Sequence, residues 1–397
     1  MTASPHTTPS RIGLGTVLVT AMASATYLAA GLGVIATFLL DDLGISRTQV
    51  GALISGTIIV AAVASPLAGG LTDNLGGKGA VSVVYVASAF GFVGVAISPH
   101  YWVMFIPVVA AAIGQAAANP ATNKLIALHA PPGRRGILTG IKQSGVQAGI
   151  FLGGALVPAA ALAFGWRLTL ALVAVVPIAG LVVAWLVLPT DRPSVEERPD
   201  VTGTMLTPAI MFLAVYGGLM GFGAAYTFLI PLFAEEALGL SETVAGFSAG
   251  VVGLTALFAR ITWARVAEKT DRFGLTLFLL ALGSMGATAV LMSATSVGVS
   301  LLWLGVVMTG LSSSSWNSVA MLAVIHHAGD ARAGRGSGIV MLGFLVGLGV
   351  APPIMGWTVD EFGTYLWVWV MAMVALVLAA GLSAWWVFMY RKTRPAD

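Results

Sequence analysis

Long apolar runs separated by short polar segments dominate the chain. A helix that crosses the hydrocarbon core of a bilayer needs about 20 consecutive apolar residues, and the sequence holds twelve runs of this kind. The predicted spans are residues 14–39, 50–71, 79–98, 102–126, 136–160, 168–189, 207–230, 244–265, 274–294, 298–324, 336–357 and 365–389. The pattern predicts an all-α membrane protein with twelve transmembrane helices.

The longest polar connection lies between the sixth and seventh runs. It divides the chain into a predicted N-terminal six-helix bundle (1–189), a cytoplasmic linker (190–206) and a C-terminal six-helix bundle (207–397). The other connections are short, so consecutive helices in each half are expected to be antiparallel neighbours.

The two halves carry an internal repeat. Around the second and eighth runs, residues recur after 195 positions: Leu43, Gly44, Ser46 and Gly51 correspond to Leu238, Gly239, Ser241 and Gly246. Around the fifth and eleventh runs the offset is 198: Gly140, Gly145, Gly149 and Gly165 correspond to Gly338, Gly343, Gly347 and Gly363. Two pseudo-symmetric bundles are therefore predicted, a plan typical of transporters with a site between repeats.

The composition excludes several other classes of protein. Of the 397 residues, 58% are hydrophobic and 9% are charged, whereas a soluble domain has about 25% charged residues. The net charge of +3 is scattered singly, which gives no patch for nucleic acid. The chain has no cysteine, and its five histidines fall in loops or near helix ends. We therefore expect that the protein is not an enzyme and has no catalytic residues, no metal site and no cofactor.

The basic residues predict the orientation. With the N-terminus inside, 15 of the 19 Lys and Arg residues fall in cytoplasmic segments, as the positive-inside rule requires. Arg47 and Arg167 fall on the other side. The N-terminal segment lacks the pattern of a cleaved signal peptide, so the first run is expected to be a retained helix. Both termini are predicted to be cytoplasmic, in a bacterial inner membrane.

The loop after the second run resembles the G-x-x-x-D-(R/K)-x-G-(R/K)-(R/K) motif of the major facilitator superfamily. The residues that match are Gly69, Asp73, Gly76 and Lys78, whereas Asn74 and Gly77 lack the usual positive charge. The resemblance covers about residues 12 to 390 and implies alternating access by a monomer. It also implies that Asp73 lies at the N-terminus of the eleventh helix, where a carboxylate is favourable, and that this contact stabilises the outward-facing state.

Weaker features fit the same resemblance. Residues 260–269 look like a worn second copy of the motif, with Glu268 and Lys269 in the acidic and basic positions. The Phe164–Arg167 run, FGWR, is also similar to this superfamily. The alternative function is a proton-coupled multidrug or small-solute efflux antiporter. Two departures from the pattern of such antiporters weaken this interpretation. Ala110 stands where many proton-coupled carriers have arginine, and the antiporter pattern of the fifth helix is only approximated.

The predicted spans hold no Asp or Glu, and their only deep charges are two cations, one in each half. Lys142 lies seven residues inward from Arg135 and Arg260 lies eight residues before Glu268, or about 10 and 12 Å deep. A charge at this depth costs roughly 2.5 to 3.5 kcal/mol on insertion scales and usually faces a wet cavity or a partner. Both are therefore candidates for the functional site.

Each cation shares a helix face with glycines, which mark close helix contacts. Lys142 shares its stripe with Gly145, Gly149 and Gly153, and Arg260 shares one with Gly246, Gly250 and Gly253. In the superfamily the fifth and eighth helices face each other, so the resemblance implies one cavity that holds both cations. We predict that a small organic anion, a mono- or dicarboxylate, supplies the missing negative charge. Arg260 would bind it bidentately and Lys142 as a point charge.

Structural roles stay open for both cations. Lys142 could extend towards the cytoplasm, and Arg260 could pair with loop carboxylates or helix-end carbonyls. Secondary candidates are polar residues near mid-membrane that could bind a ligand or one another: Tyr27, Gln115, Asn119, Asn123, Gln143, Gln147, Tyr226 and Asn317. The expected partners are the lipid bilayer and an anionic small molecule. Transport would proceed by anion exchange, facilitated uptake or proton symport.

Overall fold

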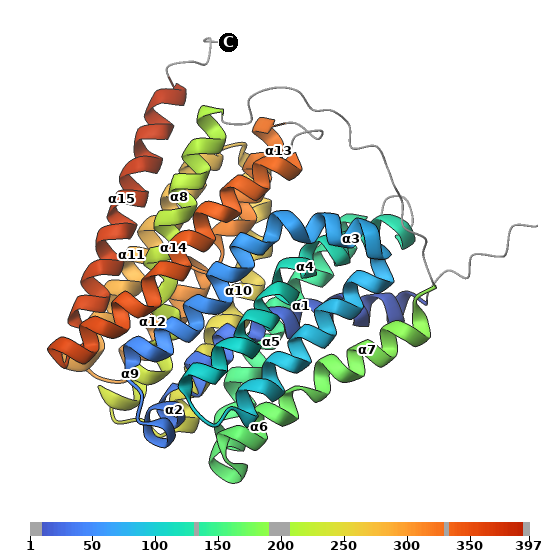
Figure 1. Cartoon of the computed structure of the whole chain (residues 1–397). Helices are drawn as coiled ribbons and strands as arrows, with labels where there is room; N and C mark the ends of the chain where they lie inside the picture. Colours follow the sequence, from blue (N-terminus) through green and yellow to red (C-terminus); the bar gives the residue numbers. More distant parts are fainter. Residues whose placement is uncertain (1–9, 131–134, 190–206, 329–332, 392–397) are drawn as a thin grey trace, which may run out of the picture. The chain divides into compact units, whose positions relative to one another are not determined.

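The computed structural model describes residues 10–130, 135–189, 207–328 and 333–391, which are helical apart from short connections (Figure 1). Eleven of the described helical segments are long and apolar enough to cross a bilayer. Together with the tenth span, which is interrupted, they confirm the predicted twelve-helix plan. The predicted linker 190–206 lies outside the described residues, and the bundle limits 1–189 and 207–397 stay a prediction.

The chain forms two compact units. Unit 1 comprises Met1–Ile35 and Gly56–Arg198, and unit 2 comprises Ala36–Ser55 and Pro199–Asp397. The helices of unit 1 are α1 (Arg11–Val34), most of α3 (Arg47–Ile97), η1 (Tyr101–Met104), α4 (Phe105–His129), α5 (Arg135–Phe164), α6 (Trp166–Val173) and α7 (Val175–Val187). Those of unit 2 are α2 (Ala36–Leu43), the first turns of α3, α8 (Pro208–Ala224), η2 (Ala225–Phe228), α9 (Ile230–Glu236), α10 (Glu242–Thr270), α11 (Phe273–Val297), α12 (Ser300–Leu311), α13 (Trp316–Ala328), α14 (Ala333–Phe362) and α15 (Leu366–Arg391).

The tenth span is broken in the middle. Helix α12 ends at Leu311, Ser312 has φ −122° and ψ −74°, and α13 begins at Trp316. The pieces have 12 and 13 residues, too short to cross a bilayer singly. Four consecutive serines, residues 312–315, lie at the break, and serine hydroxyls compete with the helix for backbone hydrogen bonds. An apolar run therefore predicted the span but not its interruption.

Other boundaries move in similar ways. The second and third predicted spans form one element, α3, which kinks at Gly76 (φ 72°, ψ 175°). The first span continues beyond Ile35 into α2, and the seventh passes through η2 into α9. The first span of each half thus ends in a short additional helix.

The internal repeat is visible in the backbone conformation as well as in the amino-acid sequence. Residues with positive φ recur at the repeat offsets: Gly44 (59°) with Gly239 (68°), Gly165 (79°) with Gly363 (62°), and Gly76 (72°) with Asp271 (52°). Glycine reaches this region without steric cost, and Asp is among the few other residues that tolerate it. The two halves therefore turn at equivalent positions, even where the glycine has been replaced.

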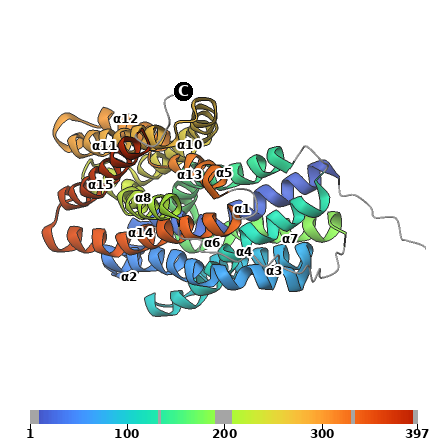
Figure 2. The ribbon, with the colours of Figure 1, turned by 90° about the horizontal axis from the view of Figure 1, so that it is seen from above.

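Equivalent glycines also mark close helix contacts inside each unit. In unit 1, α1 runs along α5, and a Cβ at Gly145 would collide with the Val19 carbonyl. In unit 2, α8 runs along α14 (Figure 2), and a Cβ at Gly343 would collide with the Ala214 carbonyl. Small residues allow helices in lipid to approach closely. The predicted glycine stripe of the fifth helix is thus a packing surface in unit 1, and its repeat does the same in unit 2.

Candidate functional site

Lys142 of α5 lies in a polar site on α4 of unit 1. Its ammonium Nζ donates to Asn119 Oδ1 (3.1 Å), Thr122 Oγ1 (3.2 Å) and Asn123 Oδ1 (2.5 Å). Thr122 and Asn123 follow Asn119 by three and four residues, about one helical turn, so all three partners lie on the same side of α4. These four residues are called the Lys142 site below.

The Lys142 site provides hydrogen bonds without opposite charge. Lys142 is only 1% exposed, and among the described residues its three partners are all neutral oxygens. An ammonium has three donors, so its hydrogen bonds are satisfied while its charge is not compensated. Burying a charge without a counter-charge is unfavourable, and an anion that reached this site would remove the penalty.

The amides beside Lys142 lie on an accessible surface. Asn119 and Asn123 are exposed and Gln115, one turn further along α4, is half-buried. On α5, Gln143 is exposed and Gln147 is buried. Of the predicted polar candidates, the structure therefore brings Asn119 and Asn123 to Lys142, and it adds Thr122, which the sequence did not single out. The hydroxyl of Thr122 was hidden by its small size and by the alanine-rich stretch around it.

Tyr27 of α1 is packed against α5 away from the Lys142 site. A Cβ at Gly153 would collide with its ring, and its centroid is 6.3 Å from that of Phe92. The Tyr27 hydroxyl is buried and has no hydrogen-bond partner among the described residues. The proposed ligand role of Tyr27 stays a prediction.

Arg260 of α10 lies at the broken helix of unit 2. Its Nε donates to the carbonyl of Ser314 (2.9 Å), and Trp263 Nε1, one turn further along α10, donates to the carbonyl of Leu311 (2.8 Å). A break in a membrane helix leaves carbonyls without intrahelical partners, and these must be satisfied by neighbouring groups. Helix α10 therefore supports the interruption between α12 and α13.

The remaining candidates of unit 2 make interhelical contacts. The Tyr226 hydroxyl is within hydrogen-bond distance of Thr309 Oγ1 (3.1 Å) and Ser313 Oγ (3.3 Å), and Asn317 Nδ2 donates to Met341 Sδ (3.3 Å). Lys142 belongs to unit 1 and Arg260 to unit 2, so the expectation of one shared cavity stays a prediction.

The residues of the motif after the second predicted span have separate structural roles. Gly76 forms the kink of α3, and Gly69 has open space beside it. Lys78 Nζ donates to the carbonyls of Trp185 (3.1 Å) and Leu188 (2.8 Å), at the C-terminal end of α7, where a cation is favoured by the helix dipole. The side chain of Asp73 lies outside the described residues. In the second half, Glu268 and Lys269 are exposed at the end of α10.

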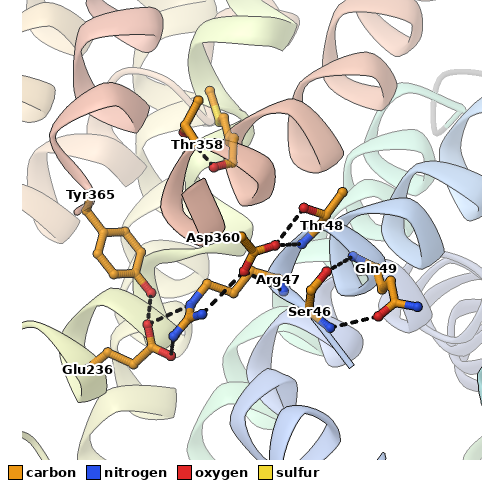
Figure 3. A network of polar contacts seen from close by, with 9 residues as sticks. Ser46, Arg47, Thr48, Gln49, Glu236, Thr358, Asp360 and Tyr365 are labelled. Atoms are coloured by element: carbon orange, nitrogen blue, oxygen red, sulfur yellow. Dashed lines mark hydrogen bonds and ion pairs between the residues drawn. The ribbon is translucent and has the colours of Figure 1, made fainter. Parts of the chain in front are cut away.

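A network around Arg47, missed by the sequence analysis, joins three segments of unit 2 (Figure 3). Arg47 Nε and Nη2 donate to the two carboxylate oxygens of Glu236 (3.0 and 2.5 Å), and Nη1 donates to Asp360 Oδ1 (3.3 Å). Tyr365 Oη also donates to Glu236 Oε2 (2.6 Å). The two-point contact has the planar geometry that suits Arg and carboxylate. Nothing local in the sequence predicts it, because each charge reads as an ordinary loop residue.

Asp360 also caps the start of α3. Its carboxylate accepts hydrogen bonds from the backbone N–H groups of Arg47 (3.1 Å) and Thr48 (2.8 Å) and from the Thr48 hydroxyl (2.6 Å). Ser46 and Gln49 complete the helix start with reciprocal hydrogen bonds of 2.8 and 3.2 Å, a capping box. One carboxylate from α14 thus satisfies two donors at the N-terminus of another helix.

A cavity of about 430 Å³ adjoins this network, and its lining includes Arg47, Glu236 and Asp360 as well as Phe233 and Trp369. On α9, the neighbouring Glu235 accepts a hydrogen bond from Thr37 Oγ1 (2.6 Å) of α2. Burial raises the pKa of Glu235, and the nearby acidic side chains act in the same direction. Within the described part of the chain, no three His, Cys, Asp or Glu side chains group to hold a metal ion.

Two repeated units of spanning helices, a helix broken within its span and a buried cation define a class of protein: secondary transporters built from internal repeats. The model of one protein family, described as the Major Facilitator Superfamily, matches residues 14–333. The chain belongs to this family and is a multi-pass membrane transporter.

Individual relatives share about a quarter of their residues with this chain. A hexuronate transporter of Bacillus subtilis is 24% identical over 386 residues, covering 89% of this chain and 87% of that protein. A gallate transporter of Pseudomonas putida is 25% identical over 206 residues, covering 52% and 45%. A multidrug resistance protein B homolog of Mycobacterium tuberculosis is 28% identical over 169 residues, covering 42% and 31%.

Solved structures agree on the fold. A bacterial homolog of the human lysosomal transporter Spinster, in an inward-facing and occupied conformation, gives a TM-score of 0.76 at 17% identity, with both chains fully covered. A mutant of the peptide transporter POT in complex with sulfate gives 0.75 at 16% identity, covering 95% of this chain and 94% of that one. At these identities the likeness concerns the fold alone.

Proposed function

We propose that the protein transports a small organic anion, a mono- or dicarboxylate, by alternating access in a bacterial inner membrane, with both termini cytoplasmic. The observation that carries the proposal is the Lys142 site, where a buried ammonium is bonded to neutral oxygens only among the described residues. A substrate carboxylate would exchange with one of these oxygens and form a charge-assisted hydrogen bond, which is about twice as strong as a neutral one.

Arg260 is the second proposed contact for the anion. Its Nε is anchored on the Ser314 carbonyl, so the guanidinium is held at the helix break rather than extended towards water. A fixed, planar cation suits a carboxylate because two parallel hydrogen bonds can form. Arg260 would then combine a structural bond with a binding role.

The relatives support the same substrate class. Hexuronate and gallate, the compounds in two of their names, are carboxylates at neutral pH, and the hexuronate transporter matches along nearly its whole length. Identities of 24 and 25% support a class of substrate rather than one compound.

The test uses purified protein in proteoliposomes. Uptake and counterflow of radiolabelled glucuronate, gallate, lactate and succinate are measured for the wild type, Lys142→Met and Arg260→Gln. The matched control is Lys124→Met, because Lys124 of α4 bonds the Thr72 carbonyl at 3.4 Å and is not part of the site. We expect saturable counterflow of at least one acid and a loss of at least tenfold in Lys142→Met.

The proposal fails if Lys142→Met and Arg260→Gln both keep wild-type uptake, or if the wild type carries none of these acids. The partial match to the multidrug resistance protein B homolog favours drug extrusion as the second candidate. Proton-driven efflux of ethidium that persists in both variants would support that alternative.

A further inference from the structure

The Lys142 site also constrains how its two amides are oriented. An ammonium can only donate hydrogen bonds, so Asn119 and Asn123 must present their carbonyl oxygens to it, as the contacts at 3.1 and 2.5 Å show. Each amide has its NH₂ group on the opposite side of the same carbon. The lysine therefore fixes the direction of both NH₂ groups, which point away from Nζ.

These NH₂ groups are available to a ligand. Neither Asn119 Nδ2 nor Asn123 Nδ2 has an acceptor among the described residues, and both side chains are exposed although Lys142 beneath them is buried. Each amide oxygen has one of its two lone pairs occupied by Lys142, and each NH₂ group adds two donors that point away from Nζ. The surface beside Lys142 therefore offers mainly donors. Such a surface matches a ligand with several acceptor oxygens close together.

We propose that Asn119 and Asn123 select carboxylates that carry a further oxygen near the carboxylate, such as hydroxy acids, oxo acids and sugar acids, over plain alkanoates and arenecarboxylates. This inference rests on the proposed function. The carboxylate accepts from Lys142 in place of the Thr122 hydroxyl, so both amides stay bound to Nζ through their oxygens. The neighbouring hydroxyl or carbonyl oxygen of the ligand then accepts from the amide NH₂ groups.

The chemistry explains why the selection acts against the simpler acids. A ligand without the second oxygen would displace water from both NH₂ groups and give no acceptor in return. Sites that bind a substrate hydroxyl by hydrogen bonds discriminate strongly against the analogue that lacks it, because their polar groups are left unpaired. A pocket lined only by apolar groups discriminates much less between the two acids of a pair.

The experiment compares pairs of acids of similar size in proteoliposomes: glucuronate with cyclohexanecarboxylate, salicylate with benzoate, and lactate with propionate. Transport efficiency is measured for the wild type, Asn119→Ala, Asn123→Ala and the control Ser144→Ala. Ser144 lies two residues beyond Lys142 and bonds its own helix at Ile141 O (2.6 Å). We expect the wild type to prefer the oxygenated member of at least one pair by more than tenfold. Each Asn→Ala variant should reduce this ratio by about three- to tenfold, the range for one neutral hydrogen bond, while Ser144→Ala leaves it unchanged.

The ratio of two acids measured in one preparation does not depend on how much of the protein is folded, and a second variant tests the charge of the site. Asn123→Asp keeps the oxygen that Lys142 needs but gives it a counter-charge, so uptake of both members of a pair should fall together by at least tenfold. Equal transport of paired acids by the wild type, or an unchanged ratio in both Asn→Ala variants, would overturn the inference and leave the proposed function standing. A wild type that carries none of the six acids would instead refute the proposed function.

Discussion

Asp360 offers a sharp test of how unit 2 is held together. Its carboxylate accepts four hydrogen bonds, from the two backbone N–H groups that begin α3, the Thr48 hydroxyl and Arg47 Nη1. Asp360→Ala removes them all and leaves two N–H groups at a helix N-terminus without this acceptor. A lost cap costs about 0.5–2 kcal/mol, and a hydrogen bond to a charged group about 1.5–3 kcal/mol.

The side chain of Asp360 is 21% exposed, so water replaces part of what is lost and the total is expected to be about 2–4 kcal/mol. In a unit of about 200 residues, 1 kcal/mol shifts the unfolding midpoint by roughly 2–4 °C. Asp360→Ala should therefore lower the Tm by about 5–12 °C, and Asp360→Asn, which keeps one acceptor, by about half as much. The assay is tryptophan fluorescence during thermal unfolding in detergent, at one fixed scan rate.

Glu361→Ala is the matched control, because this exposed carboxylate is the next residue along α14. It should stay within about 1 °C of the wild type, since surface substitutions usually change stability by less than 0.5 kcal/mol. An Asp360→Ala protein that unfolds at the same temperature as Glu361→Ala would refute the capping role and the energy assigned to it.

Further predictions follow from single contacts. Burial raises the pKa of Glu235, so the folded protein keeps this proton where the unfolded chain has lost it, and stability falls as pH rises through that window. Glu235→Gln should flatten the Tm profile on the alkaline side of the ordinary Glu pKa, and an unchanged slope there would contradict the assignment. Gly347→Ala should push α14 away from α8, because the added Cβ would meet a backbone carbonyl. It should lower the free energy of unfolding by about 1–3 kcal/mol, measured by thermal unfolding. The control Gly338→Ala has open space beside it and should be neutral or stabilising. Trp263→Phe removes the donor to Leu311 O and should cost about 1 kcal/mol; no change in Tm would show that the carbonyl finds another partner.

Much of the fold could be read from the chain because lipid imposes simple rules. Run length gave the number of crossings, and the repeated glycines marked turns such as Gly44 and Gly239, where φ is positive in both halves. The repeat could not show that Asp271 takes the conformation of Gly76, since an Asp at a turn has many other uses. Nor could apolar runs reveal the interruption at Ser312, which depends on tertiary partners for its carbonyls.

The candidate site was predicted in its parts and not in its arrangement. Lys142 stood out because a charge among apolar residues is conspicuous, and Asn119 and Asn123 because amides are few in these helices. Their meeting depends on the register of α4 against α5, which a single sequence does not specify. Arg47, Glu236 and Asp360 are a harder case, because they come from segments about 190 and 120 residues apart and each is unremarkable alone.

The interruption at residues 312–315 has a consequence for topology mapping. A count of the described helical segments that are long and apolar enough to cross a bilayer gives eleven. An odd number of crossings places the two ends of a chain in different compartments. Joining α12 and α13 into one crossing restores an even number and returns both ends to the same compartment. Reporter enzymes fused after each hydrophilic stretch would reveal the difference at every position downstream of Leu311. The assigned side of every segment after α12 therefore depends on whether the four serines lie within a crossing.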